Sequence, residues 1–331
     1  KIKNTASLSY PSEKLKVVWV TDGSDDGSPE LLKTFQQVSL FHEDERKGKI
    51  HAINRVMPYI DSPIVIFSDA NTLINKDGIK KIVAHFSNPK VGCVSGEKRI
   101  LNKKSDAASG SGEGMYWRYE STLKKWDAQL YSAVGAAGEL FAIRSVLFKA
   151  VPSDTILDDF IISLSIAKQG YTIAYEPQAY ATETGSATIA EELKRKVRIA
   201  AGGIQSIVRM RSLLNFFHHP VLSFQYISHR VLRWTVTPLA LFALIPINVY
   251  LAYQVNFTLT SIYSLLLLFQ ICFYCFVWIG KVLQNKKVKR KFIFIPYYFF
   301  IMNWSVILGI IRYLFFEQSV RWERAERGLN S

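Results

Sequence analysis

The sequence predicts an α/β domain with a mostly parallel, doubly wound sheet, followed by a helical transmembrane module. Two observations support this prediction. Over the first 200 residues, short apolar runs of strand length alternate with segments of helix length, as in βαβ units. Further on, apolar and aromatic residues dominate from Val231 to Phe316. Three runs there, at 232–253, 259–280 and 292–316, approach or exceed the roughly 20 residues that cross a hydrocarbon core.

The predicted elements follow one another in a regular order. We expect strands at residues 16–21, 63–68, 91–95, 136–143 and 172–175, where near-continuous apolar runs indicate buried strands. We expect helices at residues 29–36, 49–58, 77–86, 116–126, 158–169 and 189–214. The chain then divides into a catalytic domain (1–200), an interfacial amphipathic connector (201–229), transmembrane helices (230–316) and a C-terminal tail (317–331).

The formal net charge of +14 raises the possibility of nucleic-acid binding. However, many basic residues flank the apolar runs: Arg230 and Arg233 lie at the start of the first, and a basic cluster at 281–291 separates the second from the third. That distribution is typical of loops on the cytoplasmic side of a membrane. We therefore expect a lipid bilayer as partner and no nucleic acid. The three cysteines imply no disulfide framework, which fits a cytoplasmic catalytic domain.

Three acidic motifs stand where ligands bind in open α/β sheets, at strand ends and helix starts. Asp22 follows the first predicted strand, Asp69 follows the second, and Asp158 and Asp159 open a helix. Each motif alone is also typical of ordinary turns and N-caps.

Together with their surroundings, these motifs resemble the family-2 glycosyltransferases of GT-A fold, whose members include cellulose, hyaluronan, chitin and poly-N-acetylglucosamine synthases. The resemblance rests on VVWVTDGSDDGS, RKGKIHAIN, IVIFSDAN, GELFAIRS, TILDDF with LSIAKQGYTIAYEP, and RKVRIAAGGIQ. It implies an inverting, metal-dependent transfer of a sugar from a nucleotide diphosphate sugar, with UDP as the expected nucleotide. The acceptor would be a saccharide or a polyprenyl-linked lipid at the cytoplasmic face of the cell membrane, in cell-surface polysaccharide or glycolipid synthesis.

The resemblance also implies roles on the nucleotide side of the site. Asp22 matches the aspartate that contacts the base, and Lys49, with Asn54 a helical turn later, matches the basic residue near the nucleotide. Asp69 and Asn71 fall on the D-x-D motif, whose oxygens hold Mg²⁺ or Mn²⁺ against the diphosphate. Asn71 replaces the second aspartate and supplies a neutral carbonyl oxygen. Arg198 matches the arginine of the family's Q-x-x-R-W motif and would bind the diphosphate.

On the acceptor side, Asp159 falls on the catalytic base of the family's E-D pair, and Asp158 takes the place of its glutamate. An inverting transfer needs one carboxylate that accepts the proton of the acceptor hydroxyl. Gly138 and Glu139 match residues near the acceptor. The side chains of Trp117 and Trp126 are candidates for stacking on a sugar ring, although aromatic residues at helical spacing are more often part of a core.

Departures from the family pattern leave an alternative open. Ile199 stands where processive members carry the tryptophan of Q-x-x-R-W, which leaves polymerisation and single addition both open. The family's first strand has no counterpart, and the sequence begins at Lys1 without an initiator methionine, so we interpret the chain as a fragment. The alternative function is a non-catalytic membrane subunit or pseudoenzyme that keeps the fold.

The charge pattern also predicts a membrane topology. If the first apolar run leaves the cytoplasm and the second returns, the basic loop at 281–291 lies inside. A single crossing by the third run would then place the arginines of segment 321–327 outside. We therefore predict a cytoplasmic C-terminus and a third run that does not cross once. Pro296 and Asn303 offer places where this run bends or lies partly in the interface.

Overall fold

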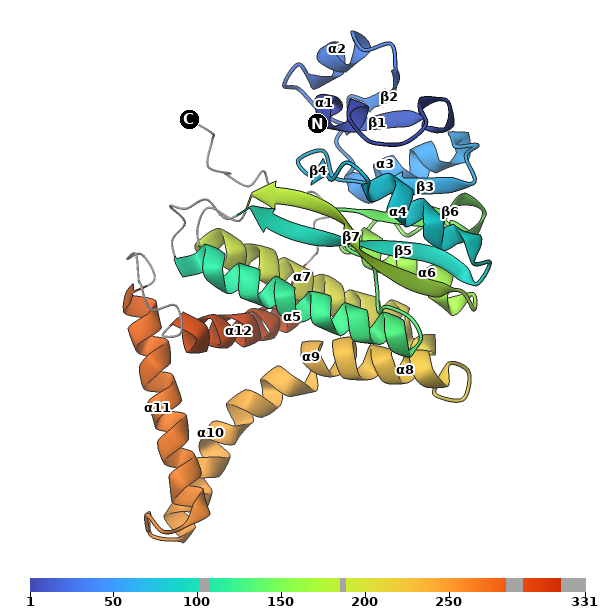
Figure 1. Cartoon of the computed structure of the whole chain (residues 1–331). Helices are drawn as coiled ribbons and strands as arrows, with labels where there is room; N and C mark the ends of the chain where they lie inside the picture. Colours follow the sequence, from blue (N-terminus) through green and yellow to red (C-terminus); the bar gives the residue numbers. More distant parts are fainter. Residues whose placement is uncertain (102–107, 185–188, 284–293, 317–331) are drawn as a thin grey trace.

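The computed structural model describes residues 1–101, 108–184, 189–283 and 294–316, and it combines an α/β domain with a set of long helices (Figure 1). The strands are β1 (Val17–Asp22), β2 (Val38–Glu43), β3 (Ile64–Phe67), β4 (Leu73–Ile74), β5 (Val91–Leu101), β6 (Phe141–Arg144) and β7 (Thr172–Thr184). The helices are α1 (Ile2–Ala6), α2 (Ser28–Lys33), α3 (Lys49–Val56), α4 (Gly78–Ala84), α5 (Ala108–Leu130), α6 (Asp158–Lys168), α7 (Ile189–Arg209), α8 (Pro220–Tyr226), α9 (Leu232–Trp234), α10 (Val236–Gln254), α11 (Ile262–Leu283) and α12 (Phe294–Phe315).

The strands form two sheets. β1 and β2 make a parallel pair, and the other five strands form a sheet in the order β3-β6-β5-β7-β4. Within the described residues, β1 pairs only with β2 and β3 only with β6, so the two sheets remain separate.

The α/β class is confirmed, but strand directions are more mixed than the mostly parallel sheet that we expected. In the larger sheet only β5 and β7 run parallel, whereas β6 is antiparallel to both β3 and β5, and β4 is antiparallel to β7. The segment before β6 explains this direction. The Ala133 amide donates to Ile173 near the start of β7, and the Gly96 amide, further along β5, donates to Leu140. Residues 133–140 therefore run alongside the sheet in one direction, and β6 runs back in the opposite direction.

Helices cover both faces of the larger sheet. Neighbouring residues Cys93 and Val94 of β5 belong to different core clusters, because alternate side chains of a strand point to opposite faces. The cluster around Cys93 includes residues of α6, and that around Val94 includes residues of α4. Helices α5 and α7 lie on one side of this sheet, toward the long helices (Figure 1).

Buried ion pairs join α5 to the segment before α10. The Glu120 carboxylate is 3 % exposed and contacts Arg233 and Arg230, with Arg230 Nη1 at 3.2 Å. Burial alone would raise the pKa of Glu120, but the two arginines outweigh this effect and hold it below its usual range. Nearby, His229 Nδ1 lies 2.5 Å from Asp127 Oδ2. The two arginines that we assigned to the membrane edge therefore also hold this segment against α5.

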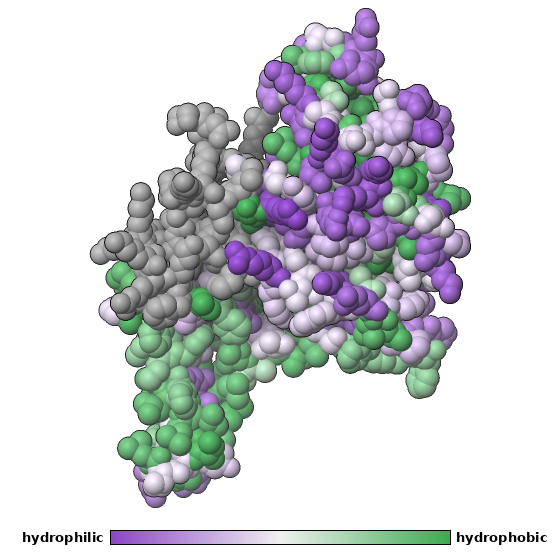
Figure 2. Space-filling model, viewed as in Figure 1, coloured by the Kyte–Doolittle hydropathy of each residue, from purple (hydrophilic) through white to green (hydrophobic). Residues whose placement is uncertain are grey.

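Three helices are long and apolar enough to cross a membrane: Val236–Gln254, Ile262–Leu283 and Ile295–Phe315. Helices α10 and α11 project away from the α/β domain and form the apolar column in Figure 2. Helix α12 instead runs along α7 (Figure 1), and a Cβ added to Gly309 would lie 2.5 Å from the Ala200 Cβ. Glycine therefore permits this close helix packing. Most of the basic loop at 281–291 and the whole tail at 317–331 lie outside the described residues.

Candidate active site

The central contact of the site is made by Lys49, at the first turn of α3. Its Nζ lies 2.9 Å from Asp69 Oδ1, two residues beyond β3, and 3.2 Å from Asp158 Oδ2, at the start of α6. Burial alone would lower the pKa of Lys49, but Asp158, Asp69 and Asp159 together raise it above its ordinary value. The structure therefore brings together three of the sequence motifs around one ammonium group.

Asp22 positions the loop that carries Lys49. Its Oδ1 accepts a hydrogen bond from the Lys47 amide at 3.0 Å, and its Oδ2 accepts one from the Gly48 amide at 2.6 Å. Gly48 has φ of 100°, a conformation that L-residues with side chains rarely adopt. The Asp22 carboxylate thus fixes the start of α3 from the end of β1.

Asp159 is the carboxylate whose proton affinity is most suited to a base. Burial raises its pKa to about 7, with further increases from Asp158 and Glu139 that Lys49 partly offsets. A Cβ added to Gly138 would lie 3.1 Å from Asp159 Oδ2, so Gly138 allows the backbone to approach this carboxylate closely. A carboxyl group with a pKa near neutrality exchanges protons effectively in general base catalysis.

Asp69 is the candidate metal ligand, and its pKa is raised mainly by burial, against the lowering effect of Lys49. Among the described residues, no three His, Cys, Asp or Glu side chains gather as a metal-binding group. Mg²⁺, however, is commonly held by one or two protein oxygens together with substrate phosphates. The Asp69 carboxylate and the Asn71 amide oxygen fit that mode of binding.

A buried network of charges, which the sequence motifs did not reveal, adjoins these carboxylates. Lys98 on β5 is 1 % exposed and contacts Glu139 at 2.5 Å and Glu183 on β7. Burial alone would raise the pKa of Glu139, but the ion pair with Lys98 lowers it to about 2. Asn71 Nδ2 donates to Glu183 Oε2 at 3.3 Å, which links the network to the D-x-N motif. Charged residues within buried strands were the available signal, because a buried charge needs a partner.

The other candidate site residues from the sequence are Asn54, Arg198, Trp117 and Trp126, and they differ in their contacts and exposure. The Asn54 amide donates to the Val151 carbonyl at 2.7 Å and accepts from the Val151 amide, so these bonds tie α3 to another loop. Arg198 is buried on α7. The ring of Trp117 lies 4.8 Å from Lys98 Nζ, whereas Trp126 is exposed on α5.

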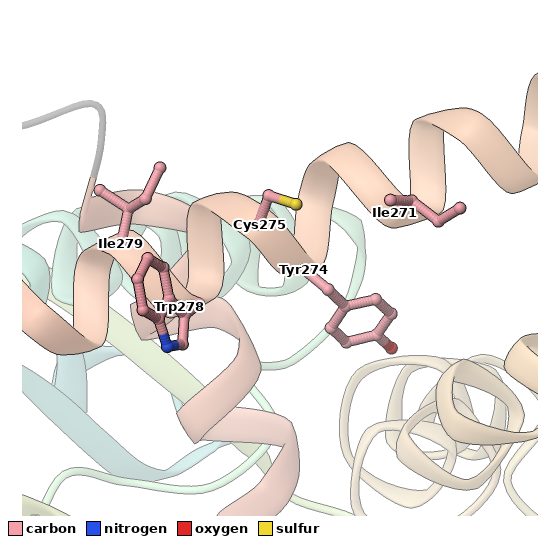
Figure 3. A pocket seen from close by; sticks show the side chains of 5 residues that line it. All are labelled: Ile271, Tyr274, Cys275, Trp278 and Ile279. Atoms are coloured by element: carbon pink, nitrogen blue, oxygen red, sulfur yellow. The ribbon is translucent and has the colours of Figure 1, made fainter.

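A surface hollow lies far along the chain, on α11. Its lining residues are Ile271, Tyr274, Cys275, Trp278 and Ile279 (Figure 3). All come from one helix that is long and apolar enough to cross a membrane, and none is acidic. The hollow therefore does not contribute to the carboxylate site.

Comparisons with known proteins show which family and fold the chain resembles. Residues 2–151 match the family described as Glycosyl transferase family 2. The poly-beta-1,6-N-acetyl-D-glucosamine synthases of Staphylococcus aureus and Staphylococcus epidermidis are each 28% identical to this chain over 218 residues, which are 63% of the chain and 52% of the relative. The chain thus spans about half the length of these relatives.

A solved structure extends the likeness of the fold to almost the whole chain. The mannosyltransferase PcManGT from Pyrobaculum calidifontis, in complex with GDP-Man and Mn²⁺, superposes with a TM-score of 0.68 at 22% identity. The match covers 95% of this chain and 82% of the other. It establishes a GT-A-like fold.

Proposed function

Because residues 2–151 form a glycosyl transferase family 2 domain, we propose that this chain transfers a sugar, with inversion, from a nucleotide diphosphate sugar to a saccharide or lipid-linked acceptor. The observation that carries the proposal is the contact of Lys49 with both Asp69 and Asp158, at 2.9 and 3.2 Å. The Lys49 ammonium group therefore lies between the candidate metal ligand, Asp69, and the start of α6, where Asp159 follows Asp158.

The chemistry is a single displacement. An acceptor hydroxyl oxygen forms a bond to the anomeric carbon while the bond from that carbon to the diphosphate oxygen breaks. Asp159 accepts the hydroxyl proton, and the nucleoside diphosphate leaves with the bonding electron pair. The pKa of about 7 suits this role, because the base is largely ionised above neutrality and still binds a proton well. Gly138, which the family pattern places near the acceptor, lies directly beside this carboxylate.

On the donor side, Asp69 and Asn71 would hold a divalent cation, Mg²⁺ or Mn²⁺. Such a cation neutralises the charge that develops on the diphosphate as it leaves. Lys49 supplies a positive charge at the same place. Asp22 holds the backbone of the loop before Lys49, and Arg198 is the proposed second contact for the diphosphate.

The class of donor and acceptor follows from similarity. The staphylococcal relatives are named as synthases of poly-beta-1,6-N-acetyl-D-glucosamine, so we propose a UDP-linked hexose or N-acetylhexosamine as donor. Ile199 leaves polymerisation and single addition both open. The apolar helices and basic flanks support a multi-pass protein of the cell membrane with its α/β domain in the cytoplasm.

The proposal is tested by incubating membranes that contain this chain with radiolabelled UDP-N-acetylglucosamine, UDP-glucose or GDP-mannose. We expect one UDP-linked donor to be incorporated, and incorporation to be lost on chelation of divalent cations. The Asp159→Asn variant is the matched control, because it removes the base and leaves the donor side intact. Equal incorporation by this variant and the wild type would overturn the mechanism.

The alternative, a non-catalytic subunit, is favoured by one observation, the replacement of the second motif aspartate by Asn71. It is distinguished by binding of UDP with Mn²⁺, measured by calorimetry. A transferase must bind both, whereas a scaffold need bind neither. Binding that disappears in the Asp69→Ala variant would support the enzyme.

A further inference from the structure

The two polar residues of the D-x-N motif contact different partners. Asp69 is held by Lys49, whereas the Asn71 amide group donates to Glu183, 112 residues further along the chain. Asn71 is exposed, and Glu183 is buried at 6 % exposure. A surface residue of the motif is therefore anchored to a fixed carboxylate beneath it.

Glu183 belongs to a network of ion pairs. Its carboxylate contacts Lys98 and lies 3.6 Å from Arg195 Nη1. Further ion pairs extend the network, and among the described residues its members are the bases Lys98, Arg195 and Lys196 and the acids Glu139, Glu183 and Glu192. A further carboxylate at position 71 would add a negative charge directly beside Glu183.

The chemistry of Glu183 determines how the Asn71 amide is oriented. Lys98 and Arg195 lie beside Glu183, and the Asn71 amide nitrogen donates to Glu183 Oε2 at 3.3 Å. The amide oxygen of Asn71 therefore points away from Glu183. An aspartate at this position would have no donor and would place a second negative charge close to the first.

We propose that Glu183 is a positioning residue of the nucleotide-sugar site, which turns the Asn71 oxygen toward the bound cation and diphosphate and makes asparagine, not aspartate, the required residue at 71. This inference rests on the proposed function. It explains the departure from the D-x-D pattern by a residue on a distant strand. Ligand charge alone predicts that aspartate at position 71 should strengthen cation binding. The role proposed for Glu183 predicts the opposite.

The test compares the purified wild-type chain with Asn71→Asp, Glu183→Gln and the double variant. Mn²⁺ binding in the presence of UDP is followed by electron paramagnetic resonance, and thermal unfolding is followed without ligands at pH 8. We expect Asn71→Asp to weaken Mn²⁺ binding about tenfold, as for loss of other supporting contacts around a metal, and to lower the melting temperature by about 2–4 °C. In the double variant the amide introduced at position 183 donates to the carboxylate introduced at position 71, so both properties should return toward wild type.

The Asn71→Ala variant is the matched control. It removes the amide without adding charge, so Glu183→Gln should not rescue it. Tighter Mn²⁺ binding by Asn71→Asp, or a double variant no better than Asn71→Asp, would overturn the role of Glu183. If the wild type binds neither Mn²⁺ nor UDP, the proposed function fails, and with it the role toward the nucleotide. The unfolding measurements would then still report on the pairing of residues 71 and 183 by itself.

Discussion

Replacing Asp159 by asparagine should abolish transfer and at the same time stabilise the fold at neutral and alkaline pH. The pKa of Asp159 is raised from 3.8 to about 7, so keeping it ionised in the folded protein is unfavourable. At 1.36 kcal/mol per pKa unit, this shift corresponds to at most about 4 kcal/mol. Asparagine avoids this penalty, and the loss of one negative charge from the first turn of α6 offsets only about 0.3–1 kcal/mol.

The sign of the effect depends on pH. Below about pH 4, Asp159 is protonated in both the folded and unfolded chains, so it contributes no difference. Between pH 4 and 7 the unfolded chain loses this proton while the folded chain keeps it, and the stability of the wild type falls as pH rises. Above pH 7 the penalty is complete. The advantage of Asp159→Asn should therefore grow from pH 4 to pH 7 and then remain constant.

Thermal unfolding of the detergent-solubilised protein at a series of pH values measures this advantage. We expect the variant to melt on the order of 5–10 °C above the wild type at pH 8 and at the same temperature near pH 4. Asp77→Asn, at an exposed position before α4, is the control and should show no such trend. A variant that keeps normal turnover, or a stability difference independent of pH, would refute the assignment of Asp159 as a buried base.

Four further outcomes are expected. Transfer by the wild type should fall about tenfold per pH unit below pH 7, because Asp159 becomes protonated. The Asp158→Asn variant should shift this acidic limb of the pH–rate profile to lower pH, because it removes the negative charge that raises the pKa of Asp159. Asp69→Ala should reduce both nucleotide binding, measured by calorimetry, and turnover, with little rescue by added Mn²⁺. Glu120→Gln should destabilise the protein by about 3–5 kcal/mol in denaturant unfolding, because the buried Arg230 and the half-buried Arg233 lose their shared carboxylate. A cysteine placed at Ser331 should resist membrane-impermeant labelling in intact cells, and efficient labelling would place the tail outside.

Local sequence patterns predicted most elements because strand and helix periodicity is a local property. Strands β1 and β3 and helices α3 and α6 lie close to the expected positions. β2 was not predicted, since Val38–Glu43 mixes polar and apolar residues and is stabilised by pairing with β1. The antiparallel direction of β6 could not be predicted from local patterns either. It depends on the path of residues 131–140, and the spacing of apolar residues does not indicate that path.

In the candidate site, too, some residues could be predicted from local sequence and others could not. Asp69, Asp158 and Lys49 stand in recognisable motifs, and the structure brings them together. Lys98 and Glu183 stand in no motif, and 85 residues separate them, so only the folded sheet shows that they pair. Asn54, which a motif placed near the nucleotide, also holds the backbone of Val151 through its amide. The motifs thus predicted which residues meet at the candidate site, whereas the long-range pairs around them appear only in the folded structure.

The helices that support the site are also those that contact the membrane module. Helix α7 contributes Arg195 to the network at Glu183, and its Ala200 packs against Gly309 of α12. Helix α5 places Trp117 beside Lys98, and its Glu120 holds the arginines before α10. A tilt of α12 or α10 would therefore be transmitted to α7 or α5, which adjoin the residues around Glu183. The same contacts therefore set both the surroundings of Glu183 and the orientation of the long apolar helices relative to the α/β domain.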